Sequence, residues 1–168
     1  LLSQPGFVLQ QTLPQSYADF ELDNLGKLYL IDKDQGIKKI SESFDSIGVF
    51  NEVRSFGPLH SIDVSNPLRV ILWYKDFATL VILDRFLNLR SSIDLRRIGV
   101  LQCNAIAQSY DNNIWLYDDL DNKVKKLSED GSILLESADF RIWFDDPPHP
   151  HRLEDFNKLL YAYDSSRG

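Results

Sequence analysis

A pattern that returns at nearly constant spacing constrains the fold of this chain more than any other feature. It consists of an apolar run, an Asp at a turn, and a second apolar segment that carries basic residues. The turn aspartates are Asp32, Asp76, Asp118 and Asp164, which gives intervals of 44, 42 and 46 residues. Repeats of this length, each with four short strands, are typical of the blades of a β-propeller.

The apolar pattern inside each unit supports the same interpretation. Residues 18–23 alternate between apolar and polar, which predicts a half-exposed strand. Leu28–Ile31 and Arg69–Tyr74 are almost unbroken apolar runs, as expected for strands that are covered on both faces. A β-sandwich would explain the alternation but not the recurring Asp motif. We therefore predict an all-β chain that forms a β-propeller of four-stranded antiparallel blades.

The repeat also predicts the organisation of the chain. We expect a lead-in segment at 1–16 with a short strand at 7–10, blades at 17–56, 57–98 and 99–140, a loop at 141–157, and a partial blade at 158–168. The loop is predicted because three prolines (Pro147, Pro148 and Pro150) remove backbone donors, and a helical turn is expected at 153–157. About three and a half blades do not close a ring. We therefore expect a fragment of a larger ring, with an apolar strand following Gly168.

Composition narrows the class of protein. The chain has 168 residues, of which 43% are hydrophobic and 26% charged, and these values fit a globular protein. A net charge of −7 argues against a nucleic-acid-binding surface. The single cysteine, Cys103, lies in an apolar segment and is interpreted as a core residue rather than a nucleophile. No apolar run is long enough for a membrane helix.

The first residues suggest a processed chain. There is no methionine, so position 1 is not a translational start. Leu1–Gln4 is consistent with the stub left after removal of a signal peptide, which predicts an exported protein.

The blade motif also resembles a known class. The pattern Gly-x-Leu-Tyr-x-x-Asp and the apolar segment after it, at Gly26–Ile40, resemble the NHL/YVTN class of six-bladed propellers. More narrowly, Phe20–Tyr29, Ser61–Leu68 and Ser109–Asp118 resemble uncharacterised exported propellers of Gram-negative bacterial envelopes. The resemblance covers residues 17–168 and implies about six blades and a periplasmic or envelope location. It assigns no catalytic residue, since the matching positions are structural.

The four turn aspartates are the most regular polar feature, and two roles are open to them. An Asp at a hairpin accepts backbone N–H groups and fixes the turn. Carboxylates from several blades could instead converge on the axis and hold Ca²⁺, as in propeller lactonases. Their presence in every unit favours the structural role, because a binding site is normally asymmetric.

The loop at 141–157 holds the other candidate site residues. Asp145, Asp146, His149 and His151 form the one compact group of metal-type ligands, and a surface loop with incidental histidines is favoured over a zinc site. Trp143 and Phe144 either anchor a partner or tuck the loop onto a blade. We assign partner binding to Trp143, Phe144, His149 and His151. His60 is interpreted as structural.

The sequence favours a non-enzymatic propeller that binds another protein, as a scaffold or accessory subunit of a bacterial cell-envelope assembly. No phosphate-binding glycine loop, nucleophile motif or paired-cysteine motif is present, and no cofactor is expected. The alternatives are a Ca²⁺-dependent hydrolase or lactonase and a carbohydrate-binding module that uses exposed Trp and Tyr. Fold alone does not separate these functions.

Overall fold

The chain folds into a series of antiparallel β-meanders, each of which pairs its strands in chain order. The computed structural model describes residues 6, 9 and 11–167, so the short strand expected at 7–10 lies outside the described residues. Blade 1 contains β1 (Asp19–Leu22), β2 (Leu28–Ile31), β3 (Ile37–Ile40) and β4 (Ser46–Phe50). Blade 2 contains β5 (Ser61–Asp63), β6 (Arg69–Tyr74), β7 (Thr79–Asp84) and β8 (Leu89–Asp94).

The second half of the chain repeats this arrangement. Blade 3 contains β9 (Cys103–Gln108), β10 (Ile114–Asp118), β11 (Lys123–Leu127) and β12 (Ile133–Glu136). Blade 4 is a hairpin of β13 (Arg152–Phe156) and β14 (Leu159–Tyr163). The described helices are single turns: α1 (Val53–Phe56), η1 (Lys75–Phe77), η2 (Leu95–Ile98) and η3 (Phe140–Ile142). The predicted all-β fold, with three four-stranded blades and part of a fourth, is confirmed.

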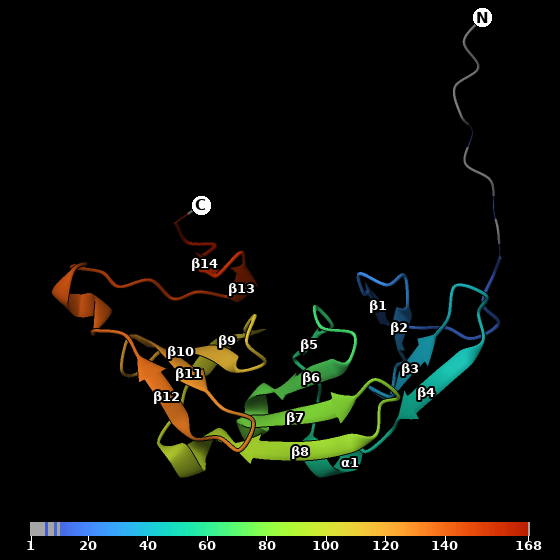
Figure 1. The fold of residues 1–168 in the computed structure, drawn as a ribbon, viewed down its shortest axis with the longest axis horizontal. Helices are drawn as coiled ribbons and strands as arrows, with labels where there is room; N and C mark the ends of the chain where they lie inside the picture. The colour runs from blue at the N-terminus through green and yellow to red at the C-terminus, as the bar shows by residue number, and fades with distance from the viewer. Residues whose placement is uncertain (1–5, 7–8, 10, 168) are drawn as a thin grey trace, which may run out of the picture.

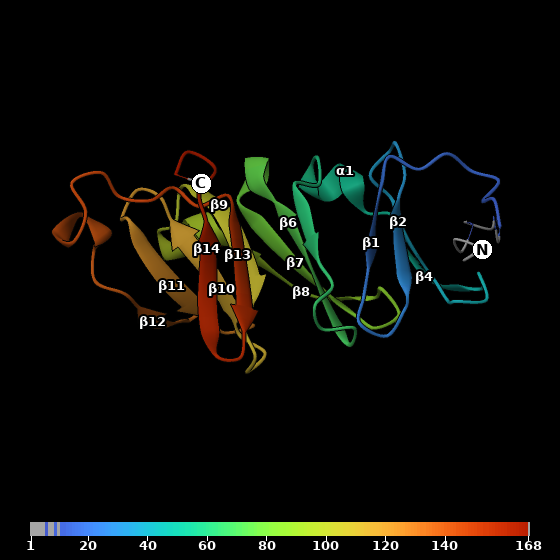
Figure 2. The same ribbon diagram turned by 90° about the horizontal axis from the view of Figure 1, so that it is seen from above.

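The blades stand side by side in an arc. Figure 1 shows β4, β8 and β12 along the outer rim, and Figure 2 shows the same arc from above. The first strand of each blade, β1, β5, β9 or β13, lies on the inner side and contributes to one common groove. This is the arrangement of a β-propeller, in which blades surround a central channel.

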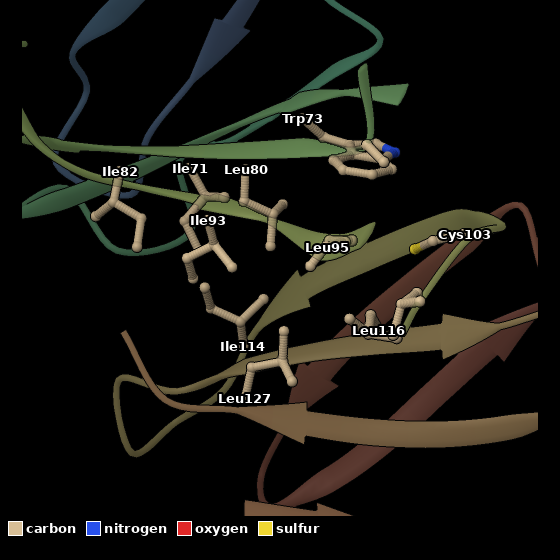
Figure 3. Close-up of a cluster of buried hydrophobic side chains, with 12 residues drawn as sticks. Ile71, Trp73, Leu80, Ile82, Ile93, Leu95, Cys103, Ile114, Leu116 and Leu127 are labelled. Atoms are coloured by element: carbon tan, nitrogen blue, oxygen red, sulfur yellow. The ribbon is translucent and has the colours of Figure 1, made fainter. Parts of the chain in front are cut away.

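Strand β6 explains why the sequence shows unbroken apolar runs. All six of its residues are buried. Ile71 and Trp73 join a core cluster with residues of blade 3 such as Leu116, and Figure 3 shows this cluster. Val70 and Leu72 belong to the cluster shared with blade 1. Because successive side chains of a strand point to opposite faces, a blade between two others needs an apolar residue at every position.

The predicted loop at 141–157 is wrong in its second half. Residues 152–156 form strand β13, not a helical turn, so blade 4 begins before residue 158. A two-residue turn makes the hairpin possible, because Asn157 and Lys158 both adopt positive φ (52° and 65°) between the paired residues Phe156 and Leu159. Leu153 is 5% exposed and packs against blade 3. The three prolines end before this strand, so they do not prevent its pairing.

Candidate functional site

The inner strands of all four blades line one groove, which has a volume of about 690 Å³. Each blade contributes a polar side chain to the lining: Glu21, Asp63, Gln108 and Glu154. The groove therefore lies where the central channel of a propeller is found and has a mainly acidic polar lining.

Two of the three histidines, His60 and His151, lie at one end of this groove. His60 directly precedes β5 and His151 directly precedes β13, and both line the groove. His149 lies two residues before His151, with the buried Pro150 between them. Burial, together with nearby Lys75, lowers the pKa of His60. Burial therefore favours the neutral form of His60, which can accept a proton.

His149 is held by two carboxylates. Its Nδ1 lies 3.3 Å from Oδ1 of Asp119, and its backbone N–H donates to Oδ2 of Asp164 at 2.8 Å. The Asp119 side chain is 2% exposed and accepts a second hydrogen bond from the backbone N–H of Asn104 at 3.1 Å. Burial raises the pKa of Asp119, although its hydrogen bonds with His149 and Asn104 oppose the shift. The pair fixes the ring of His149 while about half of that side chain faces solvent.

Cys103 lies beside this pair but is not suited to nucleophilic chemistry. It is 5% exposed, and burial together with the negative charge of Asp119 raises the pKa of its thiol to about 12. The thiol therefore stays protonated at neutral pH, whereas nucleophilic attack needs the thiolate.

The side chain of His151 makes a longer polar contact than the side chain of His149. Its backbone N–H donates to the carbonyl of Tyr163 at 2.8 Å, and its Nδ1 lies 3.5 Å from Oγ of Ser165. Asp146 is not near the histidines as a ligand but pairs with Arg167 at 2.8 Å. Across residues 6, 9 and 11–167, no three His, Cys, Asp or Glu side chains gather in a way that could hold a metal ion.

An exposed apolar surface lies at and directly after η3, ahead of His149 and His151 in the chain. We define the aromatic patch as Ile142, Trp143 and Phe144, which are 72%, 60% and 45% exposed. Half-buried Phe140 packs against Tyr117 of β10, with ring centroids 5.8 Å apart, and against Trp143 at 5.6 Å. The patch is therefore anchored through Phe140, and Trp143 is not tucked into the blade.

The turn that carries the patch is stabilised by Asp139. Its Oδ1 accepts the backbone N–H of Arg141 at 2.9 Å and so caps η3. The Arg141 guanidinium also contacts both carboxylate oxygens, with Nη2 2.6 Å from Oδ2. Hydrogen bonding with Arg141 lowers the pKa of Asp139, so the cap persists at neutral pH.

Three of the four turn aspartates accept backbone N–H groups in their hairpins. Asp32 accepts from Asp34 and Gly36, both at 2.8 Å. Asp164 accepts from Ser166 at 2.9 Å and, across the loop, from His149. Asp76 instead lies in the single turn η1, which replaces the hairpin turn of blade 2. None of the four lines the axial groove, so these carboxylates do not converge there on a calcium ion.

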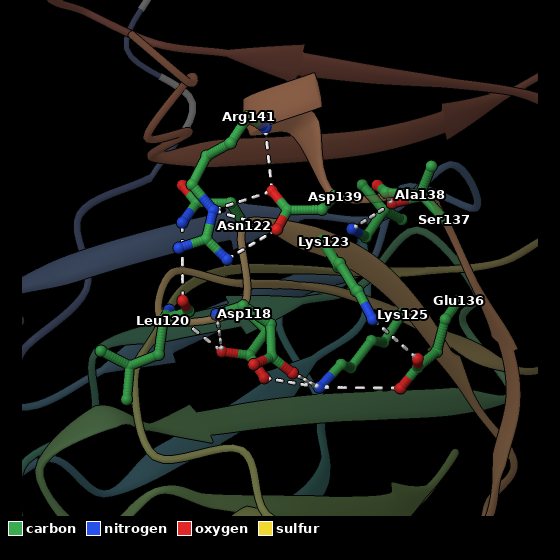
Figure 4. Close-up of polar contacts among 12 residues, drawn as sticks. Asp118, Leu120, Asn122, Lys123, Lys125, Glu136, Ser137, Ala138, Asp139 and Arg141 are labelled. Carbon is green, nitrogen blue, oxygen red and sulfur yellow. Dashed lines mark hydrogen bonds and ion pairs between the residues drawn. The ribbon is translucent and has the colours of Figure 1, made fainter. Parts of the chain in front are cut away.

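Asp118 has a second role, because it is fully buried together with a lysine (Figure 4). Its Oδ1 accepts the N–H of Leu120 at 3.1 Å, and its Oδ2 lies 2.7 Å from Nζ of Lys125. Asp121 lies 2.6 Å from the same ammonium group. Burial opposes the charge of Lys125, but the hydrogen bonds with Asp118 and Asp121 dominate and raise its pKa. The network therefore ties β11 to β10 and to the turn between these two strands in blade 3.

Sequence reasoning missed two carboxylates that join neighbouring blades at the inner strands. Asp63 accepts from the backbone N–H of Gln108 at 2.8 Å, and Asp155 accepts from Nε1 of Trp115 at 2.9 Å. Asp63 follows Ile62 at the end of β5, and Asp155 lies two residues after Leu153 near the end of β13. A comparison of the first strands in register could have found them.

Comparisons with known proteins agree with the fold. No protein-family model matches the chain, and no curated protein matches its sequence. Among solved structures, virginiamycin B lyase from Staphylococcus aureus aligns with a TM-score of 0.63 at 12% identity, over 91% of this chain and 51% of the lyase. A structure titled YCF48 bound to D1 peptide aligns with a TM-score of 0.58 at 15% identity, over 84% of this chain and 45% of YCF48.

A putative exported protein from Bacteroides fragilis aligns with a TM-score of 0.52 at 11% identity, over 94% of this chain and 48% of that protein. The chain thus spans about half the length of the structures that it matches. At these identities the likeness shows the fold alone, and it confirms the resemblance to β-propellers. Within the described residues, no helix is both long enough and apolar enough to cross a membrane.

Proposed function

We propose that this chain is a non-enzymatic, protein-binding β-propeller unit that serves as a scaffold or accessory subunit in a bacterial cell-envelope assembly. The observation that carries the proposal is the aromatic patch, which exposes Trp143 and Phe144 although Phe140 anchors the same turn on the blade. Aromatic side chains that are fixed before binding lose little entropy in an interface, and Trp is enriched among binding hot spots.

The surroundings of the patch indicate the chemistry of the partner. Asp145 and Asp146 follow it directly, and Asp146 is 89% exposed at its side chain. An apolar patch with an acidic rim fits a partner segment that presents an apolar side chain between basic residues. His149 and His151, which follow the patch in the chain, would contact the same partner. The fold supports this role, since a solved propeller of this type carries a bound peptide.

Two resemblances support the envelope location. The sequence resembles exported propellers, and one structure of the same fold is titled a putative exported protein. The proposal therefore places the chain in the periplasm or on the envelope, where its partner would also be found.

The test is affinity purification of the natively expressed protein from the envelope fraction, followed by mass spectrometry. We expect a stoichiometric protein partner that is lost with Trp143→Ala. Phe20→Ala is the matched control, because Phe20 is 63% exposed on β1, at the other end of the arc (Figure 1). A partner retained by Trp143→Ala would contradict the role of the patch, and a protein that purifies without any partner would contradict protein binding.

An enzyme remains the second candidate, and the pair of His149 and Asp119 favours it. A buried carboxylate that orients a half-exposed imidazole is the arrangement of a general base. Virginiamycin B lyase shows that the fold supports enzymes. Under this alternative, His149→Ala would abolish turnover, whereas Trp143→Ala would leave turnover unchanged. A Ca²⁺-dependent hydrolase would in addition lose turnover in a chelator.

A further inference from the structure

A second hollow lies at the end of the axial groove opposite to the histidines. It has a volume of about 310 Å³ and is formed by the turns that follow β1, β5 and β9, together with β13. We call it the hairpin-end hollow. Six of its lining residues carry amide, hydroxyl or phenol groups: Asn24, Ser65, Asn66, Gln108, Tyr110 and Asn112. Three successive blades thus each present an asparagine to one small space.

Two of these amides are already positioned by the protein. Nδ2 of Asn66 donates to Oδ1 of Asn112 at 3.0 Å, which links blade 2 to blade 3. Oδ1 of Asn66 accepts the backbone N–H of Leu68 at 3.1 Å, and Nη1 of Arg69 donates to the carbonyl of Asn112 at 2.6 Å. A primary amide has two donor hydrogens, so both Asn66 and Asn112 keep N–H groups for a ligand.

The hollow also contains buried acceptors that no donor satisfies. Gln108 is 5% exposed, and its Nε2 donates to Oδ1 of Asp63 at 3.1 Å. Its Oε1 has no hydrogen-bond partner among the described residues, and the same holds for Oδ1 of Asp155. Buried acceptors are normally paired, and here both residues line the hairpin-end hollow. Both oxygen atoms are buried beneath the surface of the hollow, so a ligand there meets the amide groups of Asn66 and Asn112 instead.

An exposed aromatic ring forms one side of the hollow. Tyr110 is 62% exposed. The ammonium groups of Lys126 and Lys158 lie 5.2 and 5.7 Å from the centre of its ring. Lys126 is paired with Asp111, its Nζ lying 2.5 Å from Oδ2, and the carboxylate of Asp155 also lines the hollow, so charges of both signs are present and partly balanced. An uncharged ligand with several hydroxyl groups matches this amide-rich lining, because each hydroxyl both donates and accepts.

We propose that the hairpin-end hollow binds a neutral saccharide of one or two rings. The ring of Tyr110 packs against the apolar C–H face of the sugar, while the amides of Asn66 and Asn112 exchange hydrogen bonds with its hydroxyl groups. A hollow of this size lies at the lower limit of small-molecule sites. The inference is independent of the proposed protein binding, because no residue of the aromatic patch lines this hollow.

Isothermal titration calorimetry of the chain with glucose, galactose, N-acetylglucosamine and cellobiose tests the proposal. We expect at least one saccharide to bind, and Tyr110→Ala to weaken it on the order of tenfold through loss of the aromatic contact. Asn66→Asp removes the amide donor but keeps the oxygen that accepts from Leu68, and is expected to weaken binding as well. Tyr161→Ala, 53% exposed on β14, is the matched control and should leave the affinity unchanged.

The thermal midpoint of each variant establishes that it is folded. Failure of all four saccharides to bind would overturn the proposal, as would unchanged affinity in folded Tyr110→Ala. Binding of tetramethylammonium or inorganic phosphate in place of the sugars would overturn it too, because the hollow would then select by charge. The aromatic patch is intact in these variants, so a failure here leaves the proposed protein binding untouched.

Discussion

The indole Nε1 of Trp115 donates to Oδ2 of Asp155 at 2.9 Å, and this hydrogen bond ties blade 3 to the β13–β14 hairpin. The same carboxylate oxygen accepts from Oγ of Ser109 at 3.0 Å and from the backbone N–H of Tyr110 at 3.2 Å. One carboxylate therefore satisfies three donors of the neighbouring blade. Hydrogen bonds to a charged group are stronger than those between neutral groups, so this contact positions the hairpin.

Asp155→Ala is expected to lower the free energy of unfolding by about 2–3 kcal/mol, because it leaves partly buried donors without an acceptor. Urea denaturation measures the change, and hydrogen exchange of the β13–β14 amides should accelerate. Glu154→Ala is the control, since Glu154 is exposed and pairs with Arg152 at 3.3 Å on the surface. The control should change stability by less than about 0.5 kcal/mol. Equal effects of the two substitutions would contradict the bridging role.

The buried pair of Lys125 and Asp118 gives a second prediction. Lys125→Met leaves the carboxylate of Asp118 buried without its cation, which we expect to cost about 3–5 kcal/mol. Lys123→Met is the matched control, because Lys123 pairs with Glu136 at 3.3 Å where both side chains are about one-third exposed. That substitution should cost at most about 1 kcal/mol. Chemical denaturation compares the two, and similar losses would show that burial of the pair is unimportant.

Gly48 lies where two blades approach closely. A Cβ atom at this position would lie 2.0 Å from the carbonyl oxygen of Phe86 in blade 2. Gly48→Ala is therefore expected to destabilise the chain by about 3 kcal/mol, because the backbone of either blade must move. Gly99→Ala is the comparison, since its φ is +84° but no atom lies within 4 Å of the added methyl group. Conformational strain alone should cost about 1 kcal/mol there. A thermal midpoint for Gly48→Ala above that of Gly99→Ala would refute the clash.

The stability of the 145–151 segment should depend on pH through Asp164. Hydrogen bonds from Oγ of Ser166 and from the backbone N–H groups of His149 and Ser166 lower the pKa of Asp164 to about 2. In the unfolded chain this pKa is about 3.9. The folded value is the lower one, so the stabilisation is complete above about pH 4 and is lost as the pH falls towards 2. Thermal midpoints between pH 2 and 7 should fall less steeply on acidification in Asp164→Asn than in the wild type. Identical pH profiles would show that Asp164 does not contribute.

Much of the fold could be predicted from sequence because the relevant signals are local. The apolar run Val70–Tyr74 specifies a strand covered on two faces, and the spacing of the turn aspartates specifies a repeated unit. Such patterns depend on the period of a strand and on turn chemistry, which neighbouring residues determine. The two-sided core around Ile71 and Leu72 follows from the same period.

Tertiary structure decided the features that join distant residues. Strand β13 forms because it pairs with β14 and buries Leu153 against blade 3, although its own sequence resembled a loop. Asp119 meets His149 across 30 residues, and Asp155 meets Trp115 across 40. The sequence identified His149, His151 and Trp143 as candidates, but it did not show that His151 shares one end of a groove with His60, and it left open whether Trp143 is exposed. A side chain's exposure and charge state depend on which blade packs beside it, and that is determined only when the blades assemble around their axis.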